Sequence, residues 1–227
     1  MPNQVQYYND FGNQYRDEII ACDNPAIWTT DIENDGQIYN EMKGRVSAQR
    51  DCALRFFKQD KPVLDLGCGF GRQSFLLAKQ HFKVVGVDSS SSMIDIAQAI
   101  FKKNELEGEF LCQSIMEFKN QEFNQIMLLD VYEHLEPKLR RWFLENISKH
   151  ICALGARLMV TFPSIEQLTL KQKLIWRWIK FKTPLHLQEH PYPIPKKHEF
   201  ESTVKDLFKI LHFSAINGTN FWVLEKI

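Results

Sequence analysis

The stretch KPVLDLGCGFGRQSFLLAK, residues 61–79, decides the fold class of this 227-residue chain. Its first part, PVLDL, is a continuous apolar run with one aspartate, which is typical of a strand buried on both faces. Gly67, Gly69 and Gly71 follow at alternate positions, and a helical pattern then begins. A strand, a glycine turn and a helix in this order predict the first unit of an α/β fold.

Strands and helices continue to alternate as far as residue 163. The predicted strands cover 62–67, 83–88, 109–114, 125–130 and 157–163, and the predicted helices cover 71–80, 89–104 and 137–155. Ser92 and Asp95 form a capping pattern near the start of the second of these helices. The alternation predicts right-handed βαβ units, and therefore a Rossmann-like, mostly parallel sheet with helices on both faces.

The rest of the chain divides into segments around this core. We expect a helical lid at 1–60, the core at 61–163, an insertion on the acceptor side at 164–200, and a closing helix and β-hairpin at 201–227. Within the last segment the pattern predicts a helix over 201–211 and strands over 212–217 and 220–227. The hairpin would bring the sheet to seven strands with an antiparallel end.

The glycine loop lacks the features of a phosphate site. The pattern GxxxxGK[ST] is absent, and Arg72 stands where the last glycine of GxGxxG would be. Asp65 would also repel a phosphate and suits a cationic ligand better. Asp88 ends the next strand, where a carboxylate can accept both hydroxyls of a ribose. A ligand with a ribose, no phosphate and a positive charge fits these residues, and S-adenosylmethionine has all three properties.

Four motifs then resemble those of the class I S-adenosylmethionine-dependent methyltransferases. They are VLDLGCGFG at 63–71, VVGVDSSSSMIDIA at 84–97, LLDVYEHL at 128–135 and ALGARLMVTFP at 153–163. Their order and spacing match the family, and the resemblance over residues 61–163 covers about half of the chain. The resemblance implies a methyltransferase of the EC 2.1.1 class that uses S-adenosylmethionine and acts on a small molecule.

The resemblance also implies a set of cofactor-binding residues. Gly67 and Gly69 are expected to approach the methionine part and the ribose, Asp65 to bind the ammonium, and Asp88 to bind the ribose hydroxyls. Met93, Ser114 and Ile115 are expected to contact the adenine, and Leu129 and Asp130 to lie close to the transferred methyl. Two positions depart from the family pattern. Ser114 stands where many members have aspartate, and Asn124 stands where many have the aspartate of "FD".

Two tyrosines and an arginine outside the four motifs, and a histidine within the third, are expected to complete the site. Tyr8 and Tyr15 could close over the cofactor or simply pack a helix on the core, and Arg45 could reach the methionine carboxylate or stay in solvent. His134 is the candidate base, because its pKa would lie near the working pH; the alternative is a histidine that only packs at a strand–helix turn.

The insertion is the most individual part of the sequence. Its run LKQKLIWRWIKFK, residues 170–182, mixes five bases with tryptophans and aliphatic residues. This composition is typical of a segment at a membrane surface, of a groove for an anionic substrate, or of a solvated lid helix, and all three alternatives remain open. The histidines at 186, 190 and 198 lie in a proline-rich stretch that disfavours a regular array of ligands, so no metal site is predicted.

Composition restricts the partners and the compartment. The formal net charge is zero, so we expect no nucleic-acid partner. The five cysteines contain no CxxC pair, the N-terminal stretch has no apolar segment typical of a signal peptide, and no apolar run is long enough to span a membrane. These features predict a cytoplasmic protein with free thiols.

Together these observations predict methyl transfer to an oxygen or nitrogen of a small-molecule acceptor, which could be anionic or lipid-like. Two alternatives stay open: a catalytically silent subunit that keeps the cofactor fold, and a methyltransferase that acts on a lipid-linked acceptor with peripheral membrane contact. The sequence predicts no oligomeric state.

Overall fold

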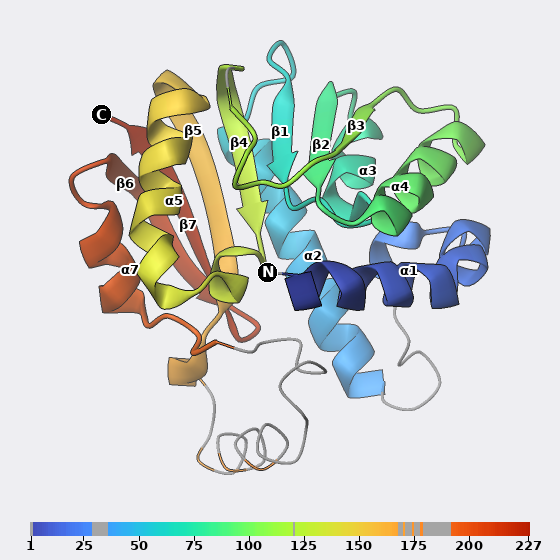
Figure 1. The fold of residues 1–227 in the computed structure, drawn as a ribbon, viewed down its shortest axis with the longest axis horizontal. Helices are drawn as coiled ribbons and strands as arrows, with labels where there is room; N and C mark the ends of the chain where they lie inside the picture. Colours follow the sequence, from blue (N-terminus) through green and yellow to red (C-terminus); the bar gives the residue numbers. More distant parts are fainter. Residues whose placement is uncertain are drawn as a thin grey trace.

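A seven-stranded mixed sheet forms the centre of the molecule in a computed structural model (Figure 1). The model describes residues 2–28, 36–119, 121–167 and 192–227, together with positions 170, 174 and 178. The strands are β1 (Val63–Leu66), β2 (Val84–Asp88), β3 (Glu109–Cys112), β4 (Phe123–Leu129), β5 (Cys152–Pro163), β6 (Phe208–Ile216) and β7 (Thr219–Lys226). Their order across the sheet is β3-β2-β1-β4-β5-β7-β6, which confirms the predicted fold class.

Strand direction sets where a ligand can bind. β1 to β5 run parallel, whereas β7 lies antiparallel between β5 and β6. The chain order reverses at β1, because β2 lies on one side of it and β4 on the other. The carboxyl ends of β1, β2 and β4 therefore meet at the switch point where open α/β sheets bind ligands.

Helices cover both faces of the sheet. Among the described residues the α-helices are α1 (Pro2–Ala21), α2 (Gly36–Phe56), α3 (Arg72–Ala78), α4 (Ser91–Lys103), α5 (Pro137–His150) and α7 (Lys197–Val204). Short 3₁₀ turns in the same part of the chain are η1 (Pro25–Ile27), η2 (Tyr132–His134) and η3 (Ile165–Gln167). Alternating strand residues divide the core: Val63 packs with α2, α3 and α4, whereas Leu64 packs with α5 and α7.

The α5 and α7 face carries an aromatic cluster, defined here as Tyr132, Phe162, Phe200 and Trp222. Its ring centroids lie 4.6–5.7 Å apart, and none of the four side chains is more than 1% exposed. Interlocking rings of this size bury a large apolar area, and Phe200 attaches α7 to the sheet through them.

Several predicted boundaries were wrong. The closing helix ends at Val204 rather than 211, because Phe208–Ile216 forms the edge strand β6, which pairs with β7. The helix predicted at 137–155 ends at His150, because the segment from Cys152 pairs with β4. Ser90, not Ser92, caps α4 by accepting from the Met93 amide at 3.3 Å.

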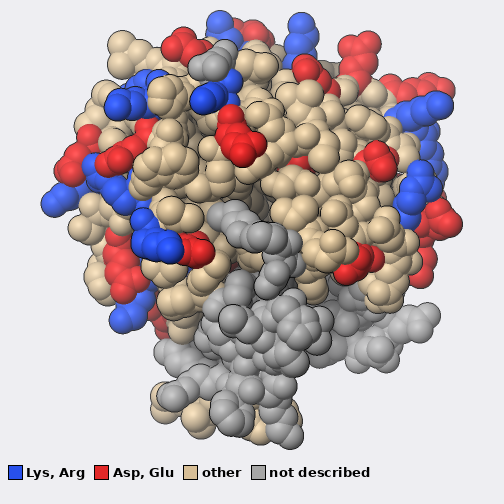
Figure 2. All heavy atoms as spheres, in the orientation of Figure 1, with Lys and Arg blue, Asp and Glu red and all other residues tan. Residues whose placement is uncertain are grey.

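Two further findings concern the outside of the molecule. Among the described residues, no helix is long and apolar enough to cross a membrane. Lysine and arginine side chains alternate with acidic ones over the face seen in Figure 2. Most of the insertion, including Lys173, Arg177, His186 and His190, lies outside the described residues.

Candidate functional site

The glycine loop joins β1 to α3 and is tied to the end of β2. The amides of Gly67 and Cys68 donate to the Val87 carbonyl at 2.7 and 3.1 Å. Gly67 has φ +77°, and a Cβ there would lie 2.5 Å from Cγ2 of Val131. Gly69 has φ +52° but open space where its side chain would be. The loop therefore needs glycine at 67 for packing, whereas the space beside Gly69 is available to a ligand.

Asp65 is a buried carboxylate beneath this loop. It is 3% exposed and accepts from the Ser74 hydroxyl at 2.7 Å. Burial raises its pKa to about 6, and the nearby carboxylate of Asp88 adds to the increase. A cation brought to Asp65 would relieve the cost of its ionisation.

Asp88 ends β2 and faces the same loop. Its two oxygens accept from the amides of Gly69 and Ser90 at 2.9 and 2.8 Å. Burial raises the pKa of Asp88 despite these bonds. The bonds orient the carboxylate toward the cavity that it lines, where it can accept from ligand hydroxyls.

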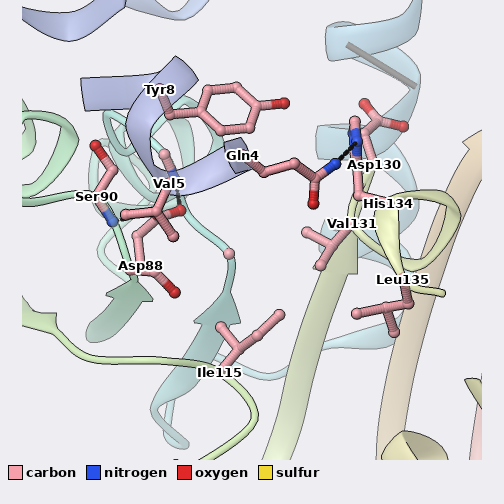
Figure 3. A pocket seen from close by; sticks show the side chains of 13 residues that line it. Gln4, Val5, Tyr8, Asp88, Ser90, Ile115, Asp130, Val131, His134 and Leu135 are labelled. Carbon is pink, nitrogen blue, oxygen red and sulfur yellow. Dashed lines mark hydrogen bonds between the residues drawn. The ribbon is translucent and has the colours of Figure 1, made fainter. Parts of the chain in front are cut away.

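Two cavities flank the glycine loop. The first, about 170 Å³ and shown in Figure 3, is lined by Gln4, Val5, Tyr8, Gly67, Gly69, Asp88, Ser89, Ser90, Ile115, Asp130, Val131, His134 and Leu135. The second, about 270 Å³, is lined by Tyr7, Tyr8, Phe11, Gln49, Asp65, Gly67, Cys68, Gly69, Phe70, Arg72, Gln73, Met93, Leu129 and Asp130. Tyr8, Gly67, Gly69 and Asp130 line both cavities, so they mark the junction between them.

The start of α1 roofs the first cavity. Figure 3 shows Gln4 reaching across to His134, whose Nδ1 lies 3.1 Å from the Gln4 amide nitrogen. Farther along α1, the Asn9 side-chain oxygen accepts from the hydroxyl of Ser90 at 2.7 Å. The helix is thus attached at the carboxyl ends of both β2 and β4, and it closes the cavity between them.

The second cavity has charges of opposite sign in its lining. Asp65 supplies the carboxylate, and Arg72 supplies a guanidinium that donates to the carbonyls of Ala26 and Trp28 at 2.8 and 3.0 Å. Burial lowers the pKa of Arg72 to about 10, and the nearby Arg45 contributes to the decrease. The guanidinium remains charged at neutral pH, so this cavity suits a zwitterionic group.

Asp130 follows β4 in a left-handed conformation, with φ +55°. Its oxygens accept from the Gln49 amide at 3.2 Å and from the Thr161 hydroxyl at 3.1 Å. Arg45 forms an ion pair with it at 3.5 Å. A non-glycine residue at positive φ is held by its surroundings, and here those surroundings aim a carboxylate at the junction.

The structure brings most predicted site residues together. Those that line a cavity are Asp65, Gly67, Gly69, Asp88, Met93, Ile115, Leu129, Asp130 and His134. Met93 and Ile115, both predicted to contact adenine, line different cavities.

Three predicted residues lie outside the two linings. Tyr15 packs against Phe11 and Trp28, with centroids 5.0 and 5.5 Å away. Ser114 accepts from the Met116 amide at 3.3 Å in a turn. Arg45 is in neither lining but forms an ion pair with Asp130, which lines both cavities.

Sequence reasoning missed the buried amides and the roof residues. Gln49 and Gln73 are 3% and 6% exposed and line the second cavity, and Gln4 contacts the predicted base. A glutamine on an otherwise apolar helix face was the available signal for the first two. Nothing local distinguishes Gln4, because its contact joins residues 130 positions apart.

No described group of three or more histidine, cysteine, aspartate and glutamate side chains is arranged to hold a metal ion. The polar groups in the two linings include carboxylates, amides, hydroxyls, the Arg72 guanidinium and the His134 imidazole. Their arrangement can bind a cation, a ribose and an amino acid moiety.

Comparison with known proteins agrees with this arrangement. Residues 63–155 match the family model of a methyltransferase domain. A "Ubiquinone biosynthesis O-methyltransferase" from Rickettsia canadensis is 34% identical over 159 residues, which are 70% of this chain and 57% of that protein. One from Coxiella burnetii is 39% identical over 82 residues, 35% of each chain. The chain therefore spans little more than half of the first relative and less of the second.

Solved structures share the fold at low sequence identity. Magnesium protoporphyrin IX methyltransferase from Synechocystis PCC 6803 with bound SAH has a TM-score of 0.71 at 18% identity, covering 98% of this chain and 97% of that one. Mycolic acid cyclopropane synthase, in a complex with SAH and CTAB, has a TM-score of 0.72 at 12% identity, with the same coverage.

Proposed function

Because residues 63–155 match a methyltransferase domain, we propose that this chain is a class I S-adenosylmethionine-dependent methyltransferase that transfers a methyl group to a hydroxyl oxygen of a small molecule. The observation that carries the proposal is the pair of cavities joined at the glycine loop, with Asp88 in one lining and Asp65 in the other. The names of the O-methyltransferase relatives favour oxygen over nitrogen as the site of methylation.

The residues present fit S-adenosylmethionine. Asp65 and Arg72 would hold the ammonium and carboxylate of its methionine part, and Asp88 would accept from its ribose hydroxyls. Ile115 and Leu135 offer apolar surface for the adenine ring, and the open space beside Gly69 lets the ligand approach the backbone. When bound, this cofactor supplies a methyl group on a positively charged sulfur.

His134 is the proposed base. It is 9% exposed and lines the first cavity, and its Nδ1 contacts Gln4. An acceptor hydroxyl that replaces the Gln4 amide at Nδ1 would be within reach for proton transfer. The remaining contribution of the protein is alignment of the two reactants, to which the α1 roof adds exclusion of water.

Calorimetry followed by a transfer assay tests the proposal. The chain should bind S-adenosylmethionine with micromolar affinity, and Asp88→Ala should abolish measurable binding. Labelled methyl groups should then appear on hydroxylated aromatic compounds, with turnover greatly reduced in His134→Ala. No binding by the wild-type chain would contradict the proposal, and binding without transfer to any acceptor would favour a catalytically silent subunit.

A lipid-like acceptor at a membrane surface is a second candidate. Leu170, Leu174 and Trp178 follow at intervals of four and are 81%, 67% and 59% exposed. Apolar side chains at this spacing share one face of a helix, and in sequence they alternate with bases. Replacing Leu170 and Trp178 by serine should reduce flotation with anionic liposomes several-fold without changing cofactor affinity. Unchanged flotation would contradict this candidate.

A further inference from the structure

Gln49 joins three parts of the site through one buried side chain. Its amide nitrogen donates to the Thr161 hydroxyl at 2.9 Å and to Asp130 at 3.2 Å, and its oxygen accepts from the Gln73 amide at 2.9 Å. Gln49 is on α2, Gln73 is on α3, and Thr161 is on β5. We call Gln73, Gln49 and Thr161 the amide relay.

The direction of every bond in the relay is determined by its ends. The Gln73 amide nitrogen also donates to the carbonyl of Val46 at 3.0 Å, and a carbonyl only accepts. The Gln49 side-chain oxygen must therefore face Gln73, so its side-chain nitrogen faces Asp130 and Thr161. Thr161 accepts from Gln49 and donates its own hydrogen to Asp130 at 3.1 Å.

Asp130 receives hydrogen bonds on both carboxylate oxygens as a result. A carboxylate that only accepts is the ionised form. The relay thus delivers a negative charge, in a set orientation, to the junction where Tyr8, Gly67 and Gly69 also lie. Asp88, Asp130 and His134 line the same cavity, and Figure 3 shows Asp130 and His134 across from Asp88.

We propose that Asp130 faces the sulfonium of the methyl donor and that Gln49 is the residue that positions it there. The inference rests on the proposed function. Asp88 lines only the first cavity and Asp65 only the second, so a ligand held by both must cross the junction. In S-adenosylmethionine the atom between ribose and methionine chain is the charged sulfur.

The consequence of this placement is a preference between substrate and product. Transfer forms a bond between the methyl carbon and the acceptor oxygen, the electron pair of the broken carbon–sulfur bond stays on sulfur, and the hydroxyl proton passes to His134. The positive charge next to Asp130 disappears in this step. Arg45 offsets only part of the carboxylate's charge, because both side chains of this pair are partly exposed and screened by water.

The test is calorimetry of the full chain with S-adenosylmethionine and with the neutral product S-adenosylhomocysteine. Asp130→Asn should shift the ratio of the two affinities about tenfold against the charged ligand, and Gln49→Met about three- to fivefold. Affinity for the product should change less than about twofold in both variants. Thr161→Val, which removes one donor to Asp130, should shift the ratio in the same direction and serves as a second variant if Gln49→Met does not fold.

Gln125→Met is the matched control. Gln125 is 4% exposed, and its amide nitrogen donates to the carbonyls of Lys58 and Lys61 at 2.9 and 3.0 Å, at the opposite end of β4. The Gln125→Met variant should have a lower melting temperature and an unchanged ratio of the two affinities. The inference would be overturned if Asp130→Asn and Gln49→Met weakened the affinities for both ligands equally, or if Gln125→Met shifted the affinity ratio as much as Gln49→Met does. A wild-type chain that binds neither ligand would instead overturn the proposed function.

Discussion

On one face of the sheet, α5 and α7 cover the aromatic cluster, whereas on the other face α2 and α3 cover Asp65 and the amide relay. The four rings of the cluster pack against one another, and the charged Arg140 guanidinium of α5 lies beside them, 5.6 Å from the centroid of the Tyr132 ring. The opposite face buries a carboxylate whose pKa is raised by that burial, together with two glutamines that hydrogen-bond each other. The difference indicates that one face contributes mainly stability and the other gives up stability for a polar site.

The largest effect should come from the aromatic cluster. Trp222→Ala removes a fully buried indole and should lower the free energy of unfolding by about 3–5 kcal/mol. Affinity for S-adenosylmethionine should be retained, because Trp222 lines neither cavity. Denaturant unfolding and calorimetry at low temperature check both statements. Loss of affinity in a folded Trp222→Ala variant would contradict the assignment of stability to one face and ligand binding to the other.

Gly69→Val should have the opposite result, a large loss of ligand affinity with a small loss of stability. The left-handed backbone at Gly69 makes a β-branched residue cost about 1–2 kcal/mol of stability, yet no neighbouring atom obstructs its side chain. The same side chain would fill the space that the ligand needs, so affinity should fall at least about a hundredfold, or about 2.7 kcal/mol. A folded variant with normal affinity, measured by calorimetry, would contradict the assignment of the loop.

Asp65→Asn should stabilise the ligand-free protein while it removes binding. The folded pKa of about 6 lies above the ordinary value of 3.8, so the folded state holds this proton more tightly than the unfolded chain. Ionised Asp65 therefore costs stability, and this cost grows as the pH rises from about 4 to 6. Asparagine avoids it, with a gain of about 3 kcal/mol at pH 8.

Urea unfolding at two pH values separates this effect from a general change in packing. The gain from Asp65→Asn should be present at pH 8 and nearly absent at pH 4. A variant that is less stable than the wild type at both values would show that Asp65 contributes more to the fold than to the site.

The smallest effect concerns the pH dependence of ligand affinity. A cationic ligand needs the ionised form of Asp65, whose pKa is about 6. Affinity for S-adenosylmethionine should be constant above this pH and fall about tenfold for each pH unit below it. Calorimetry between pH 5 and 8 measures the curve, and an affinity that stays constant to pH 5 would argue against contact between Asp65 and the ammonium.

The sequence predicted the parts of the molecule that depend on local patterns. Strand ends at Asp65, Asp88 and Asp130 and the glycine loop are all readable from short periodic stretches, and the structure places them at one edge. The contacts of Gln49 and Gln4 were not predicted, because they join residues distant in the chain. A strand was predicted at 212–217, but its start was wrong, since the pairing of β6 with β7 from Phe208 onward overrides a helical pattern.

The close approach of Gly67 to Val131 has a consequence for sequence variation. A Cβ at position 67 would lie 2.5 Å from the valine methyl, so the two positions cannot vary independently. Val131 is free to become smaller, but any side chain at 67 demands a smaller partner as well as a left-handed backbone. Among homologues, glycine at the first position should therefore accompany every bulky residue at the second. In a library that randomises both sites, functional clones should be depleted of pairs in which both are large.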